Sequence, residues 1–264
     1  DVLLTGRVPD VVVMHRMING VDSFPLLAIP FFILAGNLMN NGGITVRIFD
    51  FAKALMGWMR GGLGHVNVGA SIVFSGMSGA AVADAGGLGT IEIKAMKDAG
   101  YDEEFSVGIT AASSTIGPII PPSLPMVIYG VMASVSVGQL FVAGLVPGLL
   151  MGLVLMAMIT IISRRRGYTR DAVFSFPVLG HTFKRAFLSL LTPVIIVGGI
   201  MSGAFTPTEA AIAAVVYALV LGGVVYRSLT WRRLLKVSME TIETTAVILL
   251  IVAGASIFAW ILTS

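Results

Sequence analysis

The chain has 264 residues, of which 56% are hydrophobic and only 12% charged, and its formal net charge is +3. A soluble domain carries about 25% charged residues, so this composition excludes an ordinary soluble globular protein, and the scattered positive charge argues against nucleic-acid binding. The absence of cysteine excludes disulfides, thiolate metal sites and a cysteine nucleophile.

Uncharged apolar runs organise the chain, because a membrane-spanning helix needs about 20 apolar residues. The run 105–163 contains no Asp, Glu, Lys, Arg or His and is long enough for two spans and a break. The other runs are 24–43, 61–83, 186–208, 210–226 and 244–264. No low-complexity linker divides them. We therefore predict an all-α polytopic membrane protein that forms one membrane domain over residues 1–264.

The connecting segments carry the charge. Basic residues cluster in "SRRRGYTRD" at 163–171 and in the amphipathic stretch 226–240. Loops rich in Lys and Arg stay on the cytoplasmic side of a membrane, so we assign both segments to that side. The chain opens on Asp1 and closes on apolar sequence, so we expect it to be a piece of a longer protein.

The first interruption of the apolar pattern is "SGMSGAAVADAGGLGT" at residues 75–90. Its glycines weaken a helix and its aspartate is costly in hydrocarbon. The pattern favours a hairpin that enters and leaves the membrane on one side, with its tip at residues 75–80. Asp84 then begins the return arm, either as a carboxylate beside an ion or proton path, or as a helix N-cap or a partner of Lys94 or Lys97.

The second interruption lies in "TAASSTIGPIIPPSLPMVIYG" at residues 110–130. Its four prolines remove helix donors and force neighbouring residues out of helical geometry, so the helix must stop near Gly117 and resume after Ser123. Non-helical backbone at membrane depth requires protein or a watery cavity around it. Secondary transporters use such breaks to hold coupling ions and anionic substrates, and hydroxyl and carbonyl oxygens suit an alkali cation. The alternative is an ordinary bundle with packing glycines and a proline kink.

Two shorter motifs can be interpreted on their own. "TPTE" at 206–209 predicts a helix N-terminus, with Thr206 as N-cap and Glu209 completing a capping box. "GMSG" at 76–79 resembles the nucleophile motif of rhomboid-type intramembrane serine proteases. Such an enzyme needs a base on a neighbouring span, and His65 lies at the mouth of the same segment. A protease is therefore a remote alternative, and no enzymatic activity is our expectation.

Several long stretches, in this order, resemble the large membrane subunit (DctM-like permease) of TRAP transporters, the tripartite ATP-independent periplasmic family. They are "FPLLAIPFFILAGNLMNNGGI", "FSGMSGAAVADAGGLGTIEIKAMKDAGYDEEFS", "GPIIPPSLPMVIYG", "LFVAGLVPGLLMG" and "GAFTPTEAAIAAVVYAL". The resemblance implies a multi-pass permease of the bacterial inner (cytoplasmic) membrane. It also implies two inverted repeats, each with a re-entrant hairpin and a broken transmembrane helix, and a transport part that moves like an elevator.

The resemblance further implies partners and a driving ion. The partners are a small membrane subunit (DctQ-like) and a periplasmic substrate-binding protein (DctP-like). Transport is driven by a Na⁺ gradient, and the substrate is an organic acid of the C4-dicarboxylate, 2-oxo acid or sialic acid type. No further cofactor is implied. A stand-alone ion-coupled carboxylate transporter of similar architecture is the alternative.

Mapped onto the chain, the resemblance makes residues 24–163 the first repeat and residues 184–264 the truncated start of the second. The first repeat then contains a re-entrant hairpin at about 62–96, a broken helix at about 105–131 and a helix at 138–163. Family members have further spans before this chain and a second hairpin after it. They also commonly carry serine where this chain has Ala80.

The candidate ion and substrate site draws on both interruptions. A Na⁺ site is expected among Ser75, Ser78, Ser113 and Ser114. The full set of candidate residues is Ser75, Gly76, Ser78, Gly79, Asp84, Thr110, Ser113, Ser114, Gly117, Pro121, Pro122 and Ser123.

Overall fold

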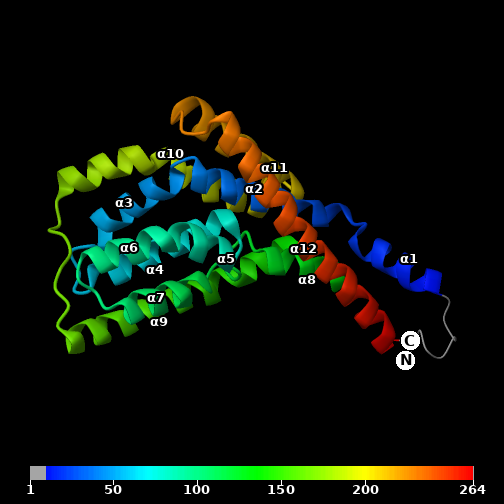
Figure 1. Ribbon diagram of the computed structural model, residues 1–264, viewed down its shortest axis with the longest axis horizontal. Coiled ribbons are helices and arrows are strands. Elements are labelled where there is room, and N and C mark those ends of the chain that lie inside the picture. Colours follow the sequence, from blue (N-terminus) through cyan, green and yellow to red (C-terminus); the bar gives the residue numbers. More distant parts are fainter. Residues whose placement is uncertain (1–9, 264) are drawn as a thin grey trace.

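The computed structural model describes residues 10–263, without the side chains of Asp10, Ser78 and Thr263. Helices make up nearly all of this part of the chain, which forms no β-strand. The elements in chain order are α1 (Asp10–Val21), η1 (Phe24–Leu27), α2 (Ala28–Asn41), α3 (Ile44–Met56), α4 (Gly62–Ser78), α5 (Ala81–Ala83), η2 (Asp84–Leu88), α6 (Gly89–Asp98), α7 (Glu103–Ser114), α8 (Leu124–Met132), α9 (Val137–Arg166), α10 (Phe176–Met201), α11 (Pro207–Leu219), η3 (Val220–Val225) and α12 (Trp231–Thr263). Most of the helices run along the long axis of the molecule (Figure 1).

Five helical segments of the described chain are long and apolar enough to cross a membrane. They are Phe24–Asn41, Val137–Arg166, Phe176–Met201, Pro207–Val225 and Trp231–Leu262. The chain is therefore an all-α polytopic membrane protein. Many large apolar side chains on α9, α10 and α12 are exposed, as expected for helices whose outer faces contact lipid rather than water.

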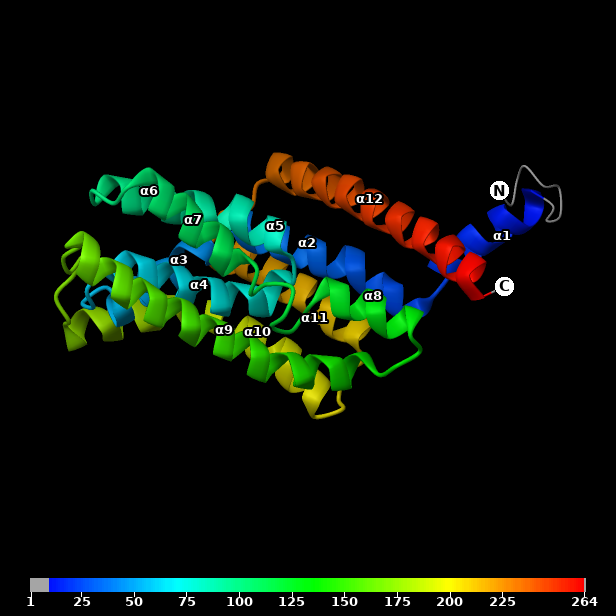
Figure 2. The same ribbon diagram turned by 90° about the horizontal axis from the view of Figure 1, so that it is seen from below.

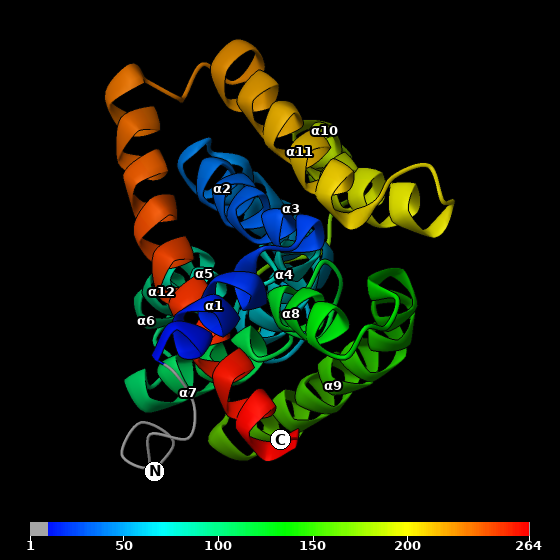
Figure 3. The ribbon, with the colours of Figure 1, turned by 90° about the vertical axis from the view of Figure 1, so that its right-hand side faces the viewer.

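The central helix is α4, which packs against α3, α7, α9 and α10. Viewed along the long axis, it lies between the α2–α3 pair and the α7–α9 pair (Figure 3). Its glycines allow close approach: a β-carbon at Gly64 would lie 2.9 Å from the Ile159 side chain, and one at Gly69 would lie 2.7 Å from the Met56 sulfur. Small residues at helix contacts are the usual device for tight packing in membranes.

A second group of helices covers one side of this centre. α2 packs against α11 and α12, while α1 lies beside the C-terminal half of α12 (Figures 1 and 2). α11 begins with the predicted capping box: Glu209 N–H donates to Thr206 Oγ1 at 3.3 Å, and Thr206 N–H donates to Glu209 Oε2 at 2.8 Å. The local interpretation of Glu209 is confirmed.

The C-terminal helix differs from the sequence prediction. The amphipathic stretch up to residue 240 and the apolar run from residue 244 form one continuous helix, α12, which starts at Trp231. Charge changes along this segment, but neither Pro nor Gly interrupts it before Gly254, so the backbone has no reason to leave helical geometry.

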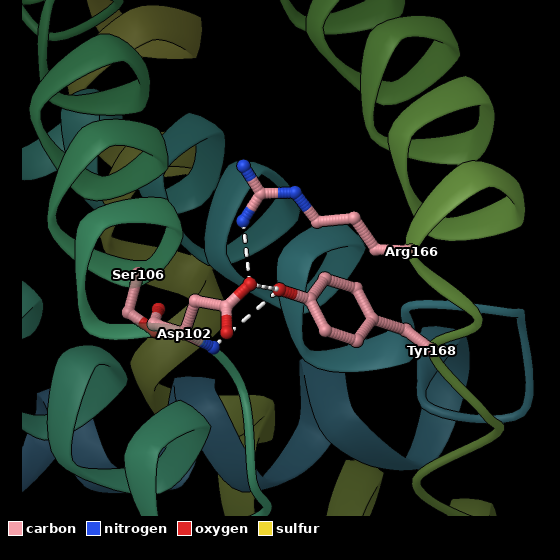
Figure 4. A network of polar contacts seen from close by, with 4 residues as sticks. All are labelled: Asp102, Ser106, Arg166 and Tyr168. Atoms are coloured by element: carbon pink, nitrogen blue, oxygen red, sulfur yellow. Dashed lines mark hydrogen bonds and ion pairs between the residues drawn. The ribbon is translucent and has the colours of Figure 1, made fainter.

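A polar cluster fastens the end of α9 to the segment before α7. The Asp102 carboxylate accepts hydrogen bonds from Tyr168 Oη at 2.6 Å and from an Arg166 guanidinium nitrogen at 2.5 Å (Figure 4). One residue earlier, Tyr101 Oη donates to Asp171 Oδ2 at 2.6 Å, and the same oxygen accepts the N–H of Leu63 at 2.8 Å. The loop after α9 is thereby tied to the first residues of both α4 and α7.

Candidate functional site

The turn between α4 and its return arm is built by Gly79. This residue has φ of 63°, and its N–H donates to the Ser75 carbonyl at 3.3 Å, the arrangement in which glycine commonly ends a helix. Ala80 is extended. The chain then reverses into α5, η2 and α6, and both η2 and α6 pack back against α4. The segment from α4 to α6 is therefore a helical hairpin with its turn at Gly79 and Ala80.

The proline-rich segment separates α7 from α8. α7 ends at Ser114, slightly before the predicted stop near Gly117, and α8 begins at Leu124 as predicted. Ser123 caps α8: its hydroxyl accepts the Met126 N–H at 3.3 Å and donates to the Pro118 carbonyl. After Ser114 the backbone tightens into turns with i→i−3 hydrogen bonds: the N–H groups of Thr115, Ile116 and Gly117 donate to the carbonyls of Ala112, Ser113 and Ser114 at 3.0–3.3 Å. The α-helix therefore ends, although the chain keeps turning as far as Gly117.

The two interruptions touch each other. The N–H of Leu124 donates to the Gly79 carbonyl at 3.2 Å, and a β-carbon at Gly79 would lie 2.3 Å from the Pro122 carbonyl oxygen. Only glycine permits this approach of the two backbones at position 79. A β-carbon at Gly76 would lie at an ordinary contact distance of 3.7 Å from the Pro121 carbonyl oxygen, but 2.7 Å from the Pro193 side chain of α10.

At the same contact between the hairpin turn and the proline-rich segment, the Gly117 backbone lies against Ala80. A β-carbon added at Gly117 would lie 3.4 Å from the Ala80 carbonyl carbon. No described donor reaches the carbonyl oxygens of the buried Pro121 and Pro122. Buried carbonyls normally have a partner. Carbonyl oxygens are ligands for hard cations, so these two groups could contribute to a cation site.

A buried polar network joins α4 to α7 next to these breaks. Asn67 Nδ2 donates to Thr110 Oγ1 at 2.7 Å, and Ser113 Oγ donates to Asn67 Oδ1 at 2.6 Å. Ser71 Oγ donates to Ser113 Oγ at 3.3 Å. Asn67 was not among the residues predicted from the sequence. Its spacing of four from Ser71 and eight from Ser75 places all three on one helix face, which is the signal that could have found it.

The remaining predicted hydroxyls are committed to helix carbonyls. Ser75 donates to the Ser71 carbonyl at 2.6 Å, and Ser114 to the Thr110 carbonyl at 2.7 Å. Their oxygens keep lone pairs that could face a cation. The side chain of Ser78 lies outside the described part of the structure, so only its backbone, at the end of α4, enters this description.

Asp84 is fully buried at the start of η2, and neither carboxylate oxygen has a hydrogen-bond partner among the described residues. Ser71 and Ser114 lie close to it, but their hydroxyls donate elsewhere. The sequence suggested two local roles for Asp84, and both are wrong. Asp84 is not a helix N-cap. It pairs with neither Lys94 nor Lys97, and the ammonium of Lys97 instead binds Glu103 at 2.8 Å. Glu92, also buried and unpartnered, was missed.

The structure thus brings Gly76, Gly79, Gly117, Pro121 and Pro122 to the contact between the hairpin and the α7–α8 break. Thr110 and Ser113 belong to the Asn67 network between α4 and α7, and Ser75 and Ser114 bond to carbonyls of their own helices. Ser123 serves α8 as a cap. Within the described residues, no group of three or more His, Cys, Asp or Glu side chains could hold a metal ion.

The geometry does not fit a serine protease. The ring nitrogens of His65 contact the Gly61 carbonyl at 3.1 Å and Thr160 Oγ1 at 3.0 Å. His65 also lies near the start of α4, whereas Ser78 ends it. At 1.5 Å per residue the two are about 20 Å apart along the helix axis, so His65 cannot serve Ser78 as a base.

Comparison with known families decides the assignment. Residues 2–264 match the family model described as "Tripartite ATP-independent periplasmic transporter, DctM component". The chain belongs to this DctM family. The match covers both interruptions and all five spanning helices, so the TRAP resemblance seen in the sequence is confirmed.

Several curated TRAP permeases are similar to the chain. It is 56% identical over 247 residues to the sialic acid TRAP transporter large permease protein SiaM of Vibrio cholerae, covering 94% of the chain and 58% of that protein. It is 41% identical over 255 residues to the 2,3-diketo-L-gulonate large permease protein YiaN of Escherichia coli, covering 96% and 60%. It is 42% identical over 249 residues to the C4-dicarboxylate large permease protein DctM of Pseudomonas aeruginosa, covering 94% and 58%.

The chain therefore spans about three fifths of the length of these relatives. They are transporter permease subunits and not enzymes, which overturns the intramembrane-protease alternative.

Proposed function

We propose that the chain is part of the large permease subunit of a Na⁺-coupled TRAP transporter that imports an organic acid across the bacterial inner membrane. In this proposal a periplasmic binding protein delivers the organic acid to the permease, and the permease associates with a small membrane subunit. The substrate classes in view are C4-dicarboxylates, 2-oxo acids and sialic acids. The relatives named above carry sialic acid, 2,3-diketo-L-gulonate and C4-dicarboxylate in their names.

One observation carries the proposal: the contact between the Gly79 turn and the Leu124 end of the proline-rich break, at 3.2 Å. Half-helix ends and unwound carbonyls that meet at membrane depth are the means by which secondary transporters hold ions and substrates. The carbonyls of Pro121 and Pro122, which accept no hydrogen bond from a described residue, are the first candidate Na⁺ ligands. The hydroxyls of Ser75, Ser78, Ser113 and Ser114 complete the candidate set, with Asp84 behind them.

The architecture is part of the same proposal. Residues 24–163 form the first repeat, with the re-entrant hairpin at about 62–96, the broken helix at about 105–131 and the following helix at 138–163. Residues 184–264 open the second, inverted repeat. In an elevator movement the hairpin, α7 and α9 would travel together, because the polar cluster around Asp102 and Asp171 joins the starts of α4 and α7 to the end of α9.

Uptake into proteoliposomes tests the proposal. The full-length permease, its small subunit and its binding protein are reconstituted, and uptake of labelled sialic acid, pyruvate and succinate is measured with an inward Na⁺ gradient or with K⁺ in its place. We expect uptake of one acid class that needs both Na⁺ and the binding protein. Uptake that proceeds without the binding protein would instead establish the stand-alone carrier, and uptake indifferent to Na⁺ would reject the coupling ion.

A further inference from the structure

A cavity of about 910 Å³ opens beside the hairpin turn, between α2, the return arm of the hairpin and α12. It reaches Ala80 at the turn and Leu124 at the start of α8, so it adjoins the contact described above. Its size is within the usual range of small-molecule sites, roughly 300–1,000 Å³. The polar side chains that α2 and the return arm contribute to the lining are uncharged. They are Asn37, Asn40, Asn41 and Thr90.

The three asparagines keep unused hydrogen-bonding groups at this cavity. Asn40 Oδ1 accepts from Thr45 Oγ1 at 2.8 Å, which leaves its Nδ2 without a partner among the described residues. Asn37 donates through Nδ2 to Thr241 at 3.2 Å, and Asn41 donates through Nδ2 to the Asn37 carbonyl at 3.0 Å. The amide oxygen of each accepts no hydrogen bond from a described residue. The wall thus offers both amide donors and amide acceptors, the complement of a ligand with hydroxyl groups.

The charges of the lining are all negative. Glu240 and Glu243 of α12 border the cavity, and no Lys, Arg or His is among its lining residues. Proteins bind a carboxylate most strongly with Arg or Lys. Lys236 Nζ lies 3.6 Å from Glu240 Oε1, whereas Glu243 forms no ion pair among the described residues. A second carboxylate on the substrate would therefore find no unpaired cation in the lining and would be repelled by Glu243. The uncharged, hydroxyl-bearing part of a ligand could instead form hydrogen bonds with the asparagine amides.

We propose that this cavity binds the hydroxylated body of a sugar acid with a single carboxylate, and that it selects against dicarboxylates. The inference rests on the proposed function and narrows its substrate class. The carboxylate of such a ligand is left to the hairpin turn and its coupling cation.

Two neighbouring glycines on the return arm provide a direct probe. A β-carbon at Gly86 would meet nothing within 4 Å, whereas one at Gly87 would lie 2.0 Å from Asn40 Nδ2. Gly86 therefore tolerates a side chain that points into open space at the cavity. The chain has no cysteine, so Gly86→Cys introduces a single thiol in this part of the protein.

The experiment measures labelling of Gly86→Cys by a charged methanethiosulfonate in the full-length permease, with any cysteine outside this chain replaced. N-acetylneuraminate, gluconate, pyruvate and succinate are added as probes, without an ion gradient. We expect N-acetylneuraminate or gluconate to slow labelling at least fivefold, and pyruvate and succinate to change it less than twofold. Failure of the thiol to react, or equal protection by succinate, would overturn the inference.

A second substitution ties the protection to the asparagines. Asn40→Leu, nearly equal in volume, combined with Gly86→Cys should abolish protection by the sugar acid. Asn19→Leu, on the exposed face of α1 away from the cavity, is the matched control and should leave protection unchanged. Protection that survives Asn40→Leu would also overturn the inference.

The two proposals fail separately. Selective protection without Na⁺-driven uptake would leave the sugar-acid cavity standing and remove the coupled transport. Na⁺-driven uptake of succinate, with no protection of the Gly86→Cys thiol by either sugar acid, would leave the transporter standing and remove the cavity as its selective site.

Discussion

The carbonyl oxygen of Gly79 accepts a hydrogen bond from the backbone N–H of Leu124 at 3.2 Å, and this bond joins the turn of the α4–α6 hairpin to the first residue of α8. Each of the two interrupted helices therefore supplies a partner for a backbone group that the other leaves free. Since unpaired backbone groups cost several kcal/mol in hydrocarbon, the two breaks stabilise each other, and neither is an isolated kink.

Gly79→Ala tests this contact. An L-residue at φ of 63° is strained by about 1–2 kcal/mol, and the added β-carbon would also meet the Pro122 carbonyl at 2.3 Å. We expect a lower unfolding temperature and at least a tenfold loss of Na⁺-driven uptake. Gly108→Ala on α7 is the control, because a β-carbon there meets nothing within 4 Å. Equal uptake by the two variants would contradict the close approach.

Asn67→Leu tests the buried network between α4 and α7. The substitution keeps the volume but removes the amide partner of Thr110 and Ser113, which retain their bonds to the Ser106 and Thr110 carbonyls. Each lost hydrogen bond costs about 0.5–1.5 kcal/mol. We expect a clear loss of thermal stability in detergent. In Asn67→Leu combined with Ser113→Ala, the two losses should be less than additive, since both remove the same bond. Strict additivity would show that the two side chains are not coupled.

The pH dependence of stability tests the cluster at Asp102. The hydrogen bond from Tyr168 and then the Arg166 guanidinium hold the pKa of Asp102 below its usual value. The folded state therefore favours the carboxylate, and the stabilisation is present above about pH 4 and lost as the pH falls through the lowered pKa.

Thermal unfolding between pH 6 and pH 3 measures this. Wild type should lose more stability on acidification than Asp102→Asn, and the two profiles should converge at low pH. Glu104→Gln, which removes an exposed acid that forms no ion pair in the described structure, should follow wild type. Parallel profiles for wild type and Asp102→Asn would contradict the cluster.

The cap of α11 makes a fourth prediction. Thr206→Ala removes the acceptor of the Glu209 N–H and should lower the free energy of unfolding by about 1 kcal/mol. Thr206→Ser retains the hydroxyl and should recover most of that loss in the same denaturation assay. A serine variant as unstable as the alanine variant would show that the methyl group, and not the cap, is what matters.

Sequence rules correctly predicted the helix ends that are set by neighbouring residues. The four prolines between residues 118 and 125 interrupt the helix whatever the tertiary structure, so the start of α8 at Leu124 could be predicted from the sequence. So could the capping box at Thr206 and Glu209. The exact end of α7 and the continuity of α12 from Trp231 could not, because charge pattern and hydropathy do not mark a backbone break.

The site was only partly predictable for the same reason. The glycines and hydroxyls stood out by type, but which of them meet depends on how α4 and α7 pack. Asn67 was hidden in an apolar run, and its role appears only when Thr110 and Ser113 face it. For Asp84 the sequence offered nearby lysines as partners, whereas the folded hairpin turns the carboxylate inward, away from both.

The mutual satisfaction of the two breaks also constrains how the protein is made. When the hairpin leaves the ribosome, the N–H that its turn requires belongs to Leu124, which follows only after α6 and α7 have been synthesised. Until then the Gly79 carbonyl has water or a translocation machinery as its only neighbour. The turn of the hairpin therefore obtains this backbone partner only after the α7–α8 break has been synthesised.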